Sequence, residues 1–300
     1  GGRRKHLLWW RTGNDVVHRR DNQYLFDRNN RDRCDARTSE AVSPLTLSRV
    51  AAADTAAPAA FRAVQILEFL GSRCEPATIT EVAGALGLAK SSVSNLITTL
   101  EAAGMVRRLS RGWSLGYKVL ELGQSMLAST SLASEFARAT RVLPTLSNET
   151  ALLAVLDGME VVYLARHDGT QPIRLASDIG KRMPASVTAL GKSMLAALSE
   201  AELNARLDGL HTLPRPTKRA FRTVTELRRD LDAIRQRGYA IDDEQNTIGV
   251  TCFAVAMTGV PQPTAVSTTL LTQRVRPENQ SRLVDDLQTL ARELATYAIG

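Results

Sequence analysis

The 300-residue sequence contains few of the residue types from which many structural and catalytic sites are built. It has three cysteines and four histidines, and the cysteines are too widely spaced to predict a disulfide framework or a C-x-x-C metal or redox site. No apolar run approaches the ~18 residues that span a bilayer. These absences argue against a disulfide-rich secreted protein, a zinc-ribbon protein and a membrane-spanning protein. We expect a cytoplasmic protein with no metal and no cofactor.

The common catalytic motifs G-x-S-x-G, H-E-x-x-H and G-x-G-x-x-G are also missing. The GKS tripeptide at 191–193 lacks the glycine that a phosphate-binding loop needs five residues earlier. One enzymatic alternative uses Cys252 as nucleophile, His167 or His211 as base, and Asp242 to orient the histidine. Nothing in the sequence brings these residues together, so we expect no catalytic residues, and a cysteine-dependent enzyme is the least favoured alternative.

Charge and length indicate two folded units with different partners. The net charge is +7, and the excess of Lys and Arg lies in the first 117 residues, whereas the remainder is nearly balanced. A domain typically holds ~100–200 residues, so this chain predicts more than one. The distribution favours an amino-terminal half that faces nucleic acid and an almost neutral carboxyl-terminal half.

Residues 80–100 have the pattern of two short amphipathic helices joined at Gly87. Glycine can adopt the left-handed conformation that ends a helix and reverses the chain. A preceding helix over 61–70 supplies a third apolar face. Two helices joined at a glycine occur in many small helical domains, but a basic hairpin follows this pair. Together they predict a winged helix-turn-helix that binds DNA.

The polar residues of this segment are the candidate DNA contacts. A recognition helix presents its amino end to the major groove, where hydroxyl and amide groups reach base edges and cations contact phosphates. An amide such as that of Asn95 can pair bidentately with adenine. On the second helix the candidates are Lys90, Ser91, Ser92, Ser94 and Asn95, and on the wing they are Arg107, Arg108 and Arg111.

Residues 1–58 differ from the rest of the chain. They contain a run rich in Arg, Asp and Asn at 15–37 that shows neither helical nor strand periodicity. We expect a disordered or non-native leader, and the alternative is a basic arm that embraces DNA. Loss of operator affinity after removal of residues 1–55 would support the arm.

The carboxyl-terminal part predicts a mixture of helices and strands. Two helical stretches begin after Tyr117 and supply candidates for a linker and a dimer contact. The Asp157-Gly158 pair lies between two apolar runs, as in a tight β-hairpin. Helices over 189–198 and 224–237, further strands and an amphipathic helix from Pro277 then indicate an α+β domain.

Several motifs in the same order resemble the isocitrate lyase regulator (IclR) family of bacterial transcription factors over about residues 61–299. The motifs are LGLAKSSV, LEAAGMVRR, YKVLELG, LAVLDGMEVVYLAR, TALGKSMLA and RGYAIDDEQNTIGVTCFA. The resemblance implies an α+β protein: a winged helix-turn-helix DNA-binding domain at 59–117, a helical linker for dimerisation at 118–135, and a GAF/profilin-like mixed α/β effector-binding domain at 136–300.

The resemblance also implies a site for a small organic ligand. The family's ligand contacts match Ala189, Leu190, Asp242, Cys252, Ser267 and Thr269. From the residues themselves, Gly191 at a helix amino end could let backbone N–H groups bind an anion such as a carboxylate.

Each candidate also has a plain structural interpretation. Asp242 could belong to a solvated acidic turn, and Cys252 could be an ordinary buried thiol. Arg166, His167 and Arg174 could bind a carboxylate or could be exposed hairpin charges.

The combined prediction is an effector-responsive transcriptional regulator, expected to be a repressor, that binds operator DNA as a dimer or dimer of dimers. Its effector is expected to be a small organic or aromatic acid. The principal alternative is a sensor or scaffold protein whose DNA module is degenerate, and this alternative would bind no duplex specifically at physiological salt.

Overall fold

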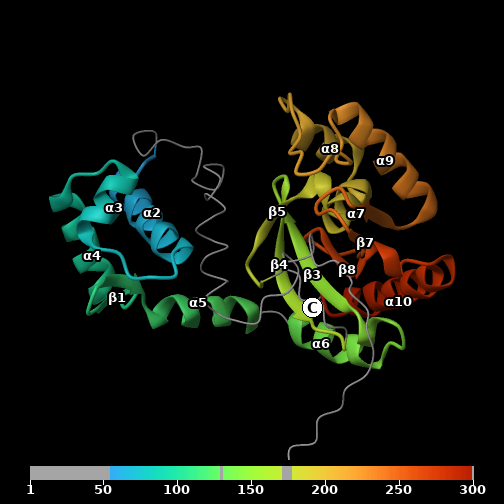
Figure 1. Ribbon diagram of the computed structural model, residues 1–300, viewed down its shortest axis with the longest axis horizontal. Coiled ribbons are helices and arrows are strands. Elements are labelled where there is room, and N and C mark those ends of the chain that lie inside the picture. Colours follow the sequence, from blue (N-terminus) through green and yellow to red (C-terminus); the bar gives the residue numbers. More distant parts are fainter. Residues whose placement is uncertain (1–54, 129–130, 171–177, 299–300) are drawn as a thin grey trace, which may run out of the picture.

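The computed structural model describes residues 55–128, 131–170 and 178–298. Most of the leader expected at 1–58 and the candidate Arg174 lie outside the described residues. The described chain forms two folded units, and helix α5 (Tyr117–Ala128) runs from one to the other (Figure 1).

The first unit is the predicted winged helix-turn-helix. It contains α2 (Pro58–Ser72), α3 (Ile79–Leu86), α4 (Lys90–Ala102) and a hairpin of β1 (Val106–Leu109) and β2 (Gly112–Leu115). The strands pair antiparallel. Its core is made by one apolar face of each element: Ile66, Leu70, Ala77, Val82, Ala83, Val93, Ile97, Leu100 and Val106.

Local sequence signals fix both ends of α3. The Thr78 hydroxyl accepts the N–H of Glu81, and the Glu81 carboxylate accepts the N–H of Thr78 at 2.8 Å, which together form a capping box. Gly87 ends the helix with a φ of 64°, and its N–H donates to the carbonyl of Ala83. Thr78, Glu81 and Gly87, which lie close together in the sequence, therefore fix α3 and the turn that orients α4.

Helix α5 carries apolar side chains into solvent. Tyr117, Leu120 and Leu122 are 68%, 61% and 51% exposed. The next helix, α6 (Leu132–Val142), instead buries Leu132 and Phe136 in the second unit. The apolar side chains of α5 therefore face solvent, whereas those of α6 belong to the core of the second unit.

The second unit is a six-stranded antiparallel sheet in the order β5-β4-β3-β8-β7-β6. Its strands are β3 (Thr150–Asp157), β4 (Glu160–His167), β5 (Arg182–Pro184), β6 (Ala240–Asp243), β7 (Val250–Ala256) and β8 (Thr264–Leu271). Its remaining helices are α7 (Ala189–Ala197), α8 (Glu200–Leu207), α9 (Val224–Arg237) and α10 (Pro277–Ala295). The sequence patterns did not predict β5 or α8.

The sheet lies between two layers of helices (Figure 1). On β3, Leu152 and Ala154 pack with α7, α8 and α9, whereas Ala151 and Leu153 pack with α6 and α10. This alternation follows from the two-residue repeat of a strand. It also means that the face of any paired strand residue can be assigned from the register.

The expectations for membrane segments and cysteines can be compared with the described residues. None of the helices described is both long enough and apolar enough to cross a membrane. Cys252 is a free thiol.

Candidate functional site

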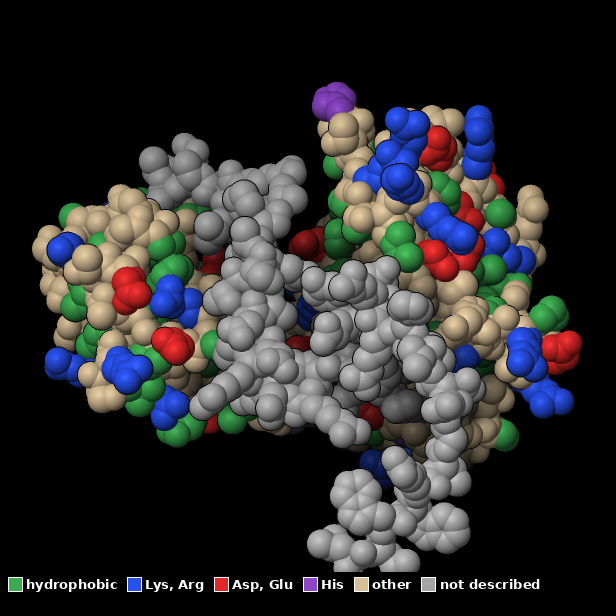
Figure 2. Space-filling view, in the orientation of Figure 1, with side chains coloured by type: hydrophobic (Ala, Val, Ile, Leu, Met, Phe, Trp, Pro, Cys, Tyr) green, Lys and Arg blue, Asp and Glu red, His purple; other side chains and the backbone are tan. Residues whose placement is uncertain are grey.

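Helix α4 presents the predicted DNA contacts on its solvent side. Lys90, Ser91 and Asn95 are exposed, and Ser92 and Ser94 are half-buried. The apolar residues of the same helix are buried in the core: Val93, Ile97 and Leu100. Lys and Arg side chains lie at the surface of this unit, together with Asp and Glu side chains and many uncharged ones (Figure 2).

The amino end of α4 differs from that of α3 in how it is capped. Its N-cap residue is Ala89, and no side chain caps its first N–H groups. Uncapped N–H groups at a helix amino end are good donors to phosphate. This end of α4 can therefore bind a DNA backbone while the side chains beyond it reach bases.

The wing arginines have unequal surroundings. The Arg108 guanidinium lies 5.9 Å from the ring centre of Trp113. The Arg107 Nη1 donates to the Tyr117 hydroxyl at 3.0 Å, and its Nε donates to the Leu115 carbonyl at 3.3 Å. Arg107 therefore joins the wing to the first residue of α5, a role that the sequence did not indicate.

Three predicted ligand contacts form a row across neighbouring strands. Asp242 on β6 pairs with Cys252 on β7, and Cys252 pairs with Thr269 on β8. Ser267 pairs with Ala254 and with Leu152. Directly paired residues point to the same face of a sheet, and Leu152 and Ala254 pack toward α7. The row therefore faces α7.

One buried hydroxyl in this region, that of Ser267, makes no hydrogen bond within the described residues. Ser267 is 2% exposed, and its Oγ has no hydrogen-bond partner in the part of the chain that the structure describes. The Cys252 Sγ lies 3.4 Å from the Thr269 Oγ1, and burial raises the pKa of the Cys252 thiol. Buried polar groups are nearly always hydrogen-bonded, so the Ser267 hydroxyl is an exception among the buried side chains.

The start of α7 packs over the same face of the sheet. Ala189 and Leu190 are 1% and 3% exposed. The Gly191 N–H donates to the Thr188 hydroxyl at 3.1 Å, and a Cβ at Gly191 would lie only 2.2 Å from the Cα of Ala185. Gly191 is therefore needed for close packing of α7 and its own N–H is bonded, whereas the expectation that backbone N–H groups at this helix end bind an anion stays a prediction.

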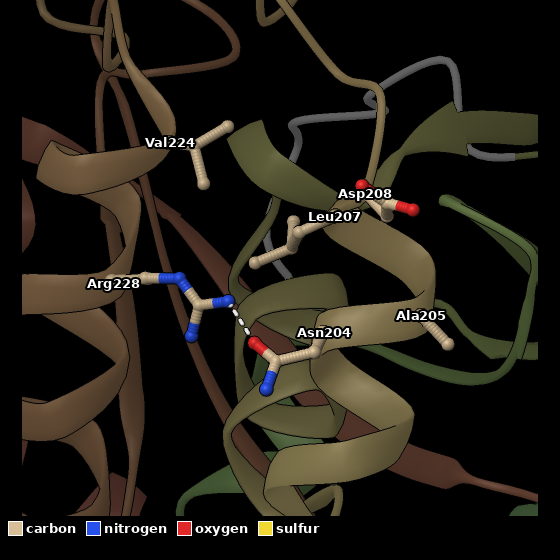
Figure 3. Close-up of a pocket in the computed structure, with 6 residues that line it drawn as sticks. All are labelled: Asn204, Ala205, Leu207, Asp208, Val224 and Arg228. Carbon is tan, nitrogen blue, oxygen red and sulfur yellow. Dashed lines mark hydrogen bonds between the residues drawn. The ribbon is translucent and has the colours of Figure 1, made fainter.

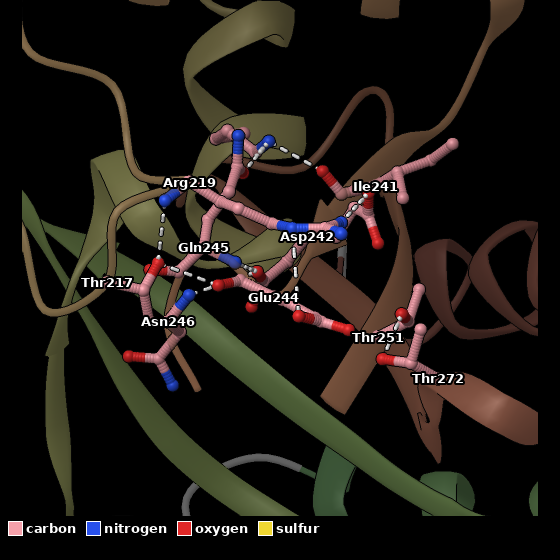
Figure 4. A network of polar contacts seen from close by, with 11 residues as sticks. Thr217, Arg219, Ile241, Asp242, Glu244, Gln245, Asn246, Thr251 and Thr272 are labelled. Atoms are coloured by element: carbon pink, nitrogen blue, oxygen red, sulfur yellow. Dashed lines mark hydrogen bonds and ion pairs between the residues drawn. The ribbon is translucent and has the colours of Figure 1, made fainter. Parts of the chain in front are cut away.

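Asp242 lies near the end of β6, where the chain enters a turn (Figure 4). It is 2% exposed, and its Oδ1 accepts the N–H groups of Gln245 at 2.8 Å and Asn246 at 3.1 Å. Burial raises the pKa of Asp242 from 3.8 to about 6, and the two backbone hydrogen bonds oppose this rise. Interpretation as a solvated acidic turn is wrong for Asp242, although Asp243 is exposed and bonds Arg219 at 2.6 Å.

The structure places His167 of the enzymatic alternative on the face of the sheet opposite to Cys252. His167 pairs with Ala151, which packs toward α6 and α10, and its Nε2 lies 3.1 Å from the Ser147 carbonyl. Cys252 packs against the cluster on the other face, and His211 is exposed. Within the described ranges, no group of three or more His, Cys, Asp and Glu could hold a metal ion.

A surface groove of about 360 Å³ lies between α8 and α9 (Figure 3). Arg228 on one wall bonds Asn204 on the other, and it also donates to Glu200 at 2.8 Å. Its lining residues include none of the predicted ligand contacts: Asn204, Ala205, Leu207, Asp208, Val224 and Arg228. The groove is therefore not the predicted ligand site.

Two buried polar residues near Asp242 were missed by the sequence reasoning. Lys192 is 0% exposed and Gln245 is 8% exposed. The position of Lys192 within the apolar pattern of 189–198 is the sequence signal for a buried lysine. Gln245 offered no signal, because its role depends on a turn and on residues distant in the chain.

A winged helix-turn-helix joined by a helix to an α+β domain with a row of buried polar groups defines an effector-responsive, DNA-binding transcriptional regulator. Two family models match the chain: the IclR helix-turn-helix domain at residues 59–110 and the bacterial transcriptional regulator IclR C-terminal domain at 124–296. The chain belongs to the IclR family.

Two curated regulators are similar to this chain in sequence. The chain is 33% identical to the transcriptional regulator XynR of Escherichia coli K12 over 232 residues, which cover 76% of this chain and 91% of XynR. It is 31% identical to the transcriptional repressor IclR of the same organism, over 65% of this chain and 73% of the repressor.

Two solved structures share the fold. A regulator from Rhodococcus sp. RHA1 matches with a TM-score of 0.70 and 27% identity, covering 80% of this chain and 98% of that one. An IclR homologue from Microbacterium hydrocarbonoxydans, complexed with 4-hydroxybenzoate, matches with a TM-score of 0.67 and 21% identity, covering 78% and 98%.

Proposed function

We propose that this regulator is a cytoplasmic repressor whose operator affinity is set by a small organic acid bound between α7 and the sheet. The observation that carries the proposal is the buried Ser267 hydroxyl, which has no partner among the described protein groups and lies on the same face as Asp242, Cys252 and Thr269. Ala189 and Leu190 would form the opposing wall. A relative named as a repressor and a homologue that holds 4-hydroxybenzoate support this choice.

The DNA contacts are part of the same proposal. Lys90, Arg108, Arg111 and the open amino end of α4 contact phosphates, and Ser91, Ser92, Ser94 and Asn95 face the bases. Arg107 contributes by holding the wing against α5. We assign these roles to three parts of the chain: a DNA-binding domain at 59–117, a linker at 118–135 and an effector-binding domain at 136–300.

The proposal is tested by selecting duplexes from a random pool and titrating the best one with salt. A specific regulator binds at about 10⁻⁸–10⁻¹¹ M, whereas nonspecific binding is about 10⁻⁴–10⁻⁶ M. Addition of 4-hydroxybenzoate or a series of small carboxylic acids should then change the operator affinity. A chain that selects no duplex would instead be the sensor or scaffold protein.

We predict that Ser267→Ala weakens effector binding without destabilising the free protein. An unsatisfied buried hydroxyl contributes nothing favourable to folding, so its removal should leave the melting temperature unchanged or raise it. Acids that stabilise the wild type should stabilise the variant less, because a ligand's stabilisation follows its affinity. Thermal unfolding with and without each acid measures both effects.

Ser193→Ala is the matched control for this prediction. Ser193 is also buried, but its hydroxyl donates to the Leu190 carbonyl at 2.8 Å. This control should lower the melting temperature and retain the response to acids. Equal acid responses of wild type and Ser267→Ala would remove Ser267 from the site.

We also infer that two copies of the chain associate through α5. Tyr117, Leu120 and Leu122 are more than half exposed on this helix, and solvent-facing apolar side chains on one helix are typical of a partner contact. Symmetric pairing of two winged units would match two half-sites about one helical turn apart. Effector binding would favour one arrangement of the paired α5 helices over another.

The Leu120→Glu variant should shift the dimer toward monomer, because a carboxylate would replace an apolar contact. Light scattering after size-exclusion chromatography measures the mass across a dilution series. Ser125→Glu is the control, since it adds the same charge at an exposed position of α5 that lies about 140° around the helix from Leu120. A dimer that survives both changes equally would place the interface elsewhere.

A further inference from the structure

Lys192 is a fully buried lysine in the middle of α7, with a relative exposure of 0%. A buried ammonium group is unfavourable unless its N–H groups are hydrogen-bonded and its charge is balanced. Burial lowers the pKa of Lys192, whereas the carboxylate of Asp230 opposes that change. The role of Lys192 in the domain therefore follows from the groups that accept its N–H donors.

Three acceptors from three different segments surround the ammonium group. The Lys192 Nζ lies 2.7 Å from the Asp230 Oδ2 on α9, 2.5 Å from the Ile241 carbonyl on β6, and within hydrogen-bond distance of the Gln245 Oε1. The ring centre of Phe221 is 5.1 Å away. An ammonium group has three N–H donors. All three have protein acceptors, so Lys192 has no donor left for an effector.

Two of these acceptors belong to the turn that carries Asp242. Ile241 directly precedes Asp242, and the N–H of Gln245 donates to the Asp242 Oδ1 at 2.8 Å. Lys192 thus binds the side chain of the same Gln245 whose backbone binds Asp242. The side chains of Lys192 and Asp242 hold this turn from two directions.

The turn needs such support because of its backbone conformation. Glu244 has a φ of 57°, in the left-handed region that favours glycine. Such a conformation persists only where surrounding contacts enforce it. The Thr217 Oγ1 adds one more support, since it lies 2.7 Å from the Glu244 carbonyl and 3.0 Å from the Gln245 carbonyl (Figure 4).

We propose that Lys192 is a positioning residue of the effector site, which fixes the 241–246 turn against α7 so that Asp242 stays in line with Cys252 and Thr269. Because Ala189 and Leu190 lie at the start of the same helix, Lys192 also sets the spacing between the two walls of the site. This inference rests on the proposed effector site and adds a residue that does not itself touch the effector.

The test is hydrogen exchange of the turn in Lys192→Met and Gln245→Met, measured by mass spectrometry on the full chain. Peptides covering 242–249 are compared with peptides from β3. If Lys192 positions the turn, exchange at 242–249 should accelerate at least tenfold more than exchange in β3. A lysine that only contributes overall stability would accelerate both regions by the same factor, and that result would overturn the proposal.

Gln245→Met keeps the test decisive if Lys192→Met fails to fold, because it leaves the Lys192–Asp230 ion pair in place. Lys218→Met and Gln236→Met are the matched controls, since both replace exposed residues of the same types, and neither should change exchange in the turn. A tenfold acceleration in the controls would also count against the role of Lys192.

The readout requires no effector, so the two proposals can fail separately. Selective acceleration in a protein that no organic acid stabilises would confirm the positioning of the turn and contradict the effector proposal. A protein that responds to acids but shows parallel exchange in both regions would retain the effector proposal and lose the role of Lys192.

Discussion

Replacement of Asn95 by alanine is expected to lower discrimination at one base pair of the operator by ~1–3 kcal/mol, or about five- to 150-fold. Asn95 is exposed on α4, one turn beyond the open amino end of the helix. An amide there can accept from and donate to an adenine edge at the same time, whereas alanine can do neither. Affinity for the operator should fall, and affinity for a duplex changed at the contacted pair should be nearly unaffected.

The measurement is a set of dissociation constants for the selected operator and its single-base-pair variants at one fixed salt concentration. Lys90→Ala is the comparison, because a phosphate contact carries no sequence information. It should weaken binding to all duplexes alike and reduce the slope of log affinity against log salt by about one. If Asn95→Ala shows the same uniform loss, Asn95 contacts the backbone and does not read a base.

The second large effect concerns pH, because burial raises the pKa of Asp242 from 3.8 to about 6. In the unfolded chain this carboxyl ionises at its ordinary value, so the folded state binds the proton more tightly. The resulting stabilisation is fully present below about pH 3.8 and is lost as the pH rises through about 6. The whole shift corresponds to about 3 kcal/mol, of which about 2 kcal/mol should be lost between pH 4 and pH 7.

Asp242→Asn isolates this contribution. The asparagine retains an Oδ1 that can accept the N–H groups of Gln245 and Asn246, and it cannot ionise. The free energy of unfolding of the wild type should therefore fall by about 2 kcal/mol relative to the variant between pH 4 and pH 7. Urea unfolding of both proteins at each pH measures the difference.

Other ionisable groups around Asp242 must be considered in this experiment. The Lys192 charge lowers the pKa of Asp242 and the Asp243 charge raises it, whereas the buried Tyr163 and Cys252 have raised pKa values of their own, to which Asp242 contributes. Asp232→Asn is the control, because that carboxylate is exposed beside Arg235 and is not among the charges that shift the pKa of Asp242, and it should keep the wild-type pH dependence. A flat difference between wild type and Asp242→Asn would show that Asp242 remains ionised when folded.

The DNA-binding unit could be predicted from sequence because its determinants are local. The capping box of Thr78 and Glu81, the left-handed Gly87 and the apolar spacing of α4 all act within a few residues. The same reasoning assigned the polar side of α4, since a helix that buries Val93 and Ile97 must expose Lys90, Ser91 and Asn95. Arg107 was grouped with the other wing arginines because its partner, Tyr117, comes close only when the hairpin folds.

In the second unit, the sequence by itself determined most helices and strands and the position of the 157–158 turn, and the family resemblance supplied the candidate residues of the proposed ligand site. Only the tertiary structure decided which of them share a face, because strand register joins residues far apart in sequence, such as Asp242, Cys252 and Thr269. It also decided that Lys192 and Gln245 are bonded to each other and that the Gly191 N–H is bonded within its own helix end. Burial and hydrogen-bond partners arise when segments from α7, α9 and the 241–246 turn meet, and no local pattern in the chain encodes that meeting.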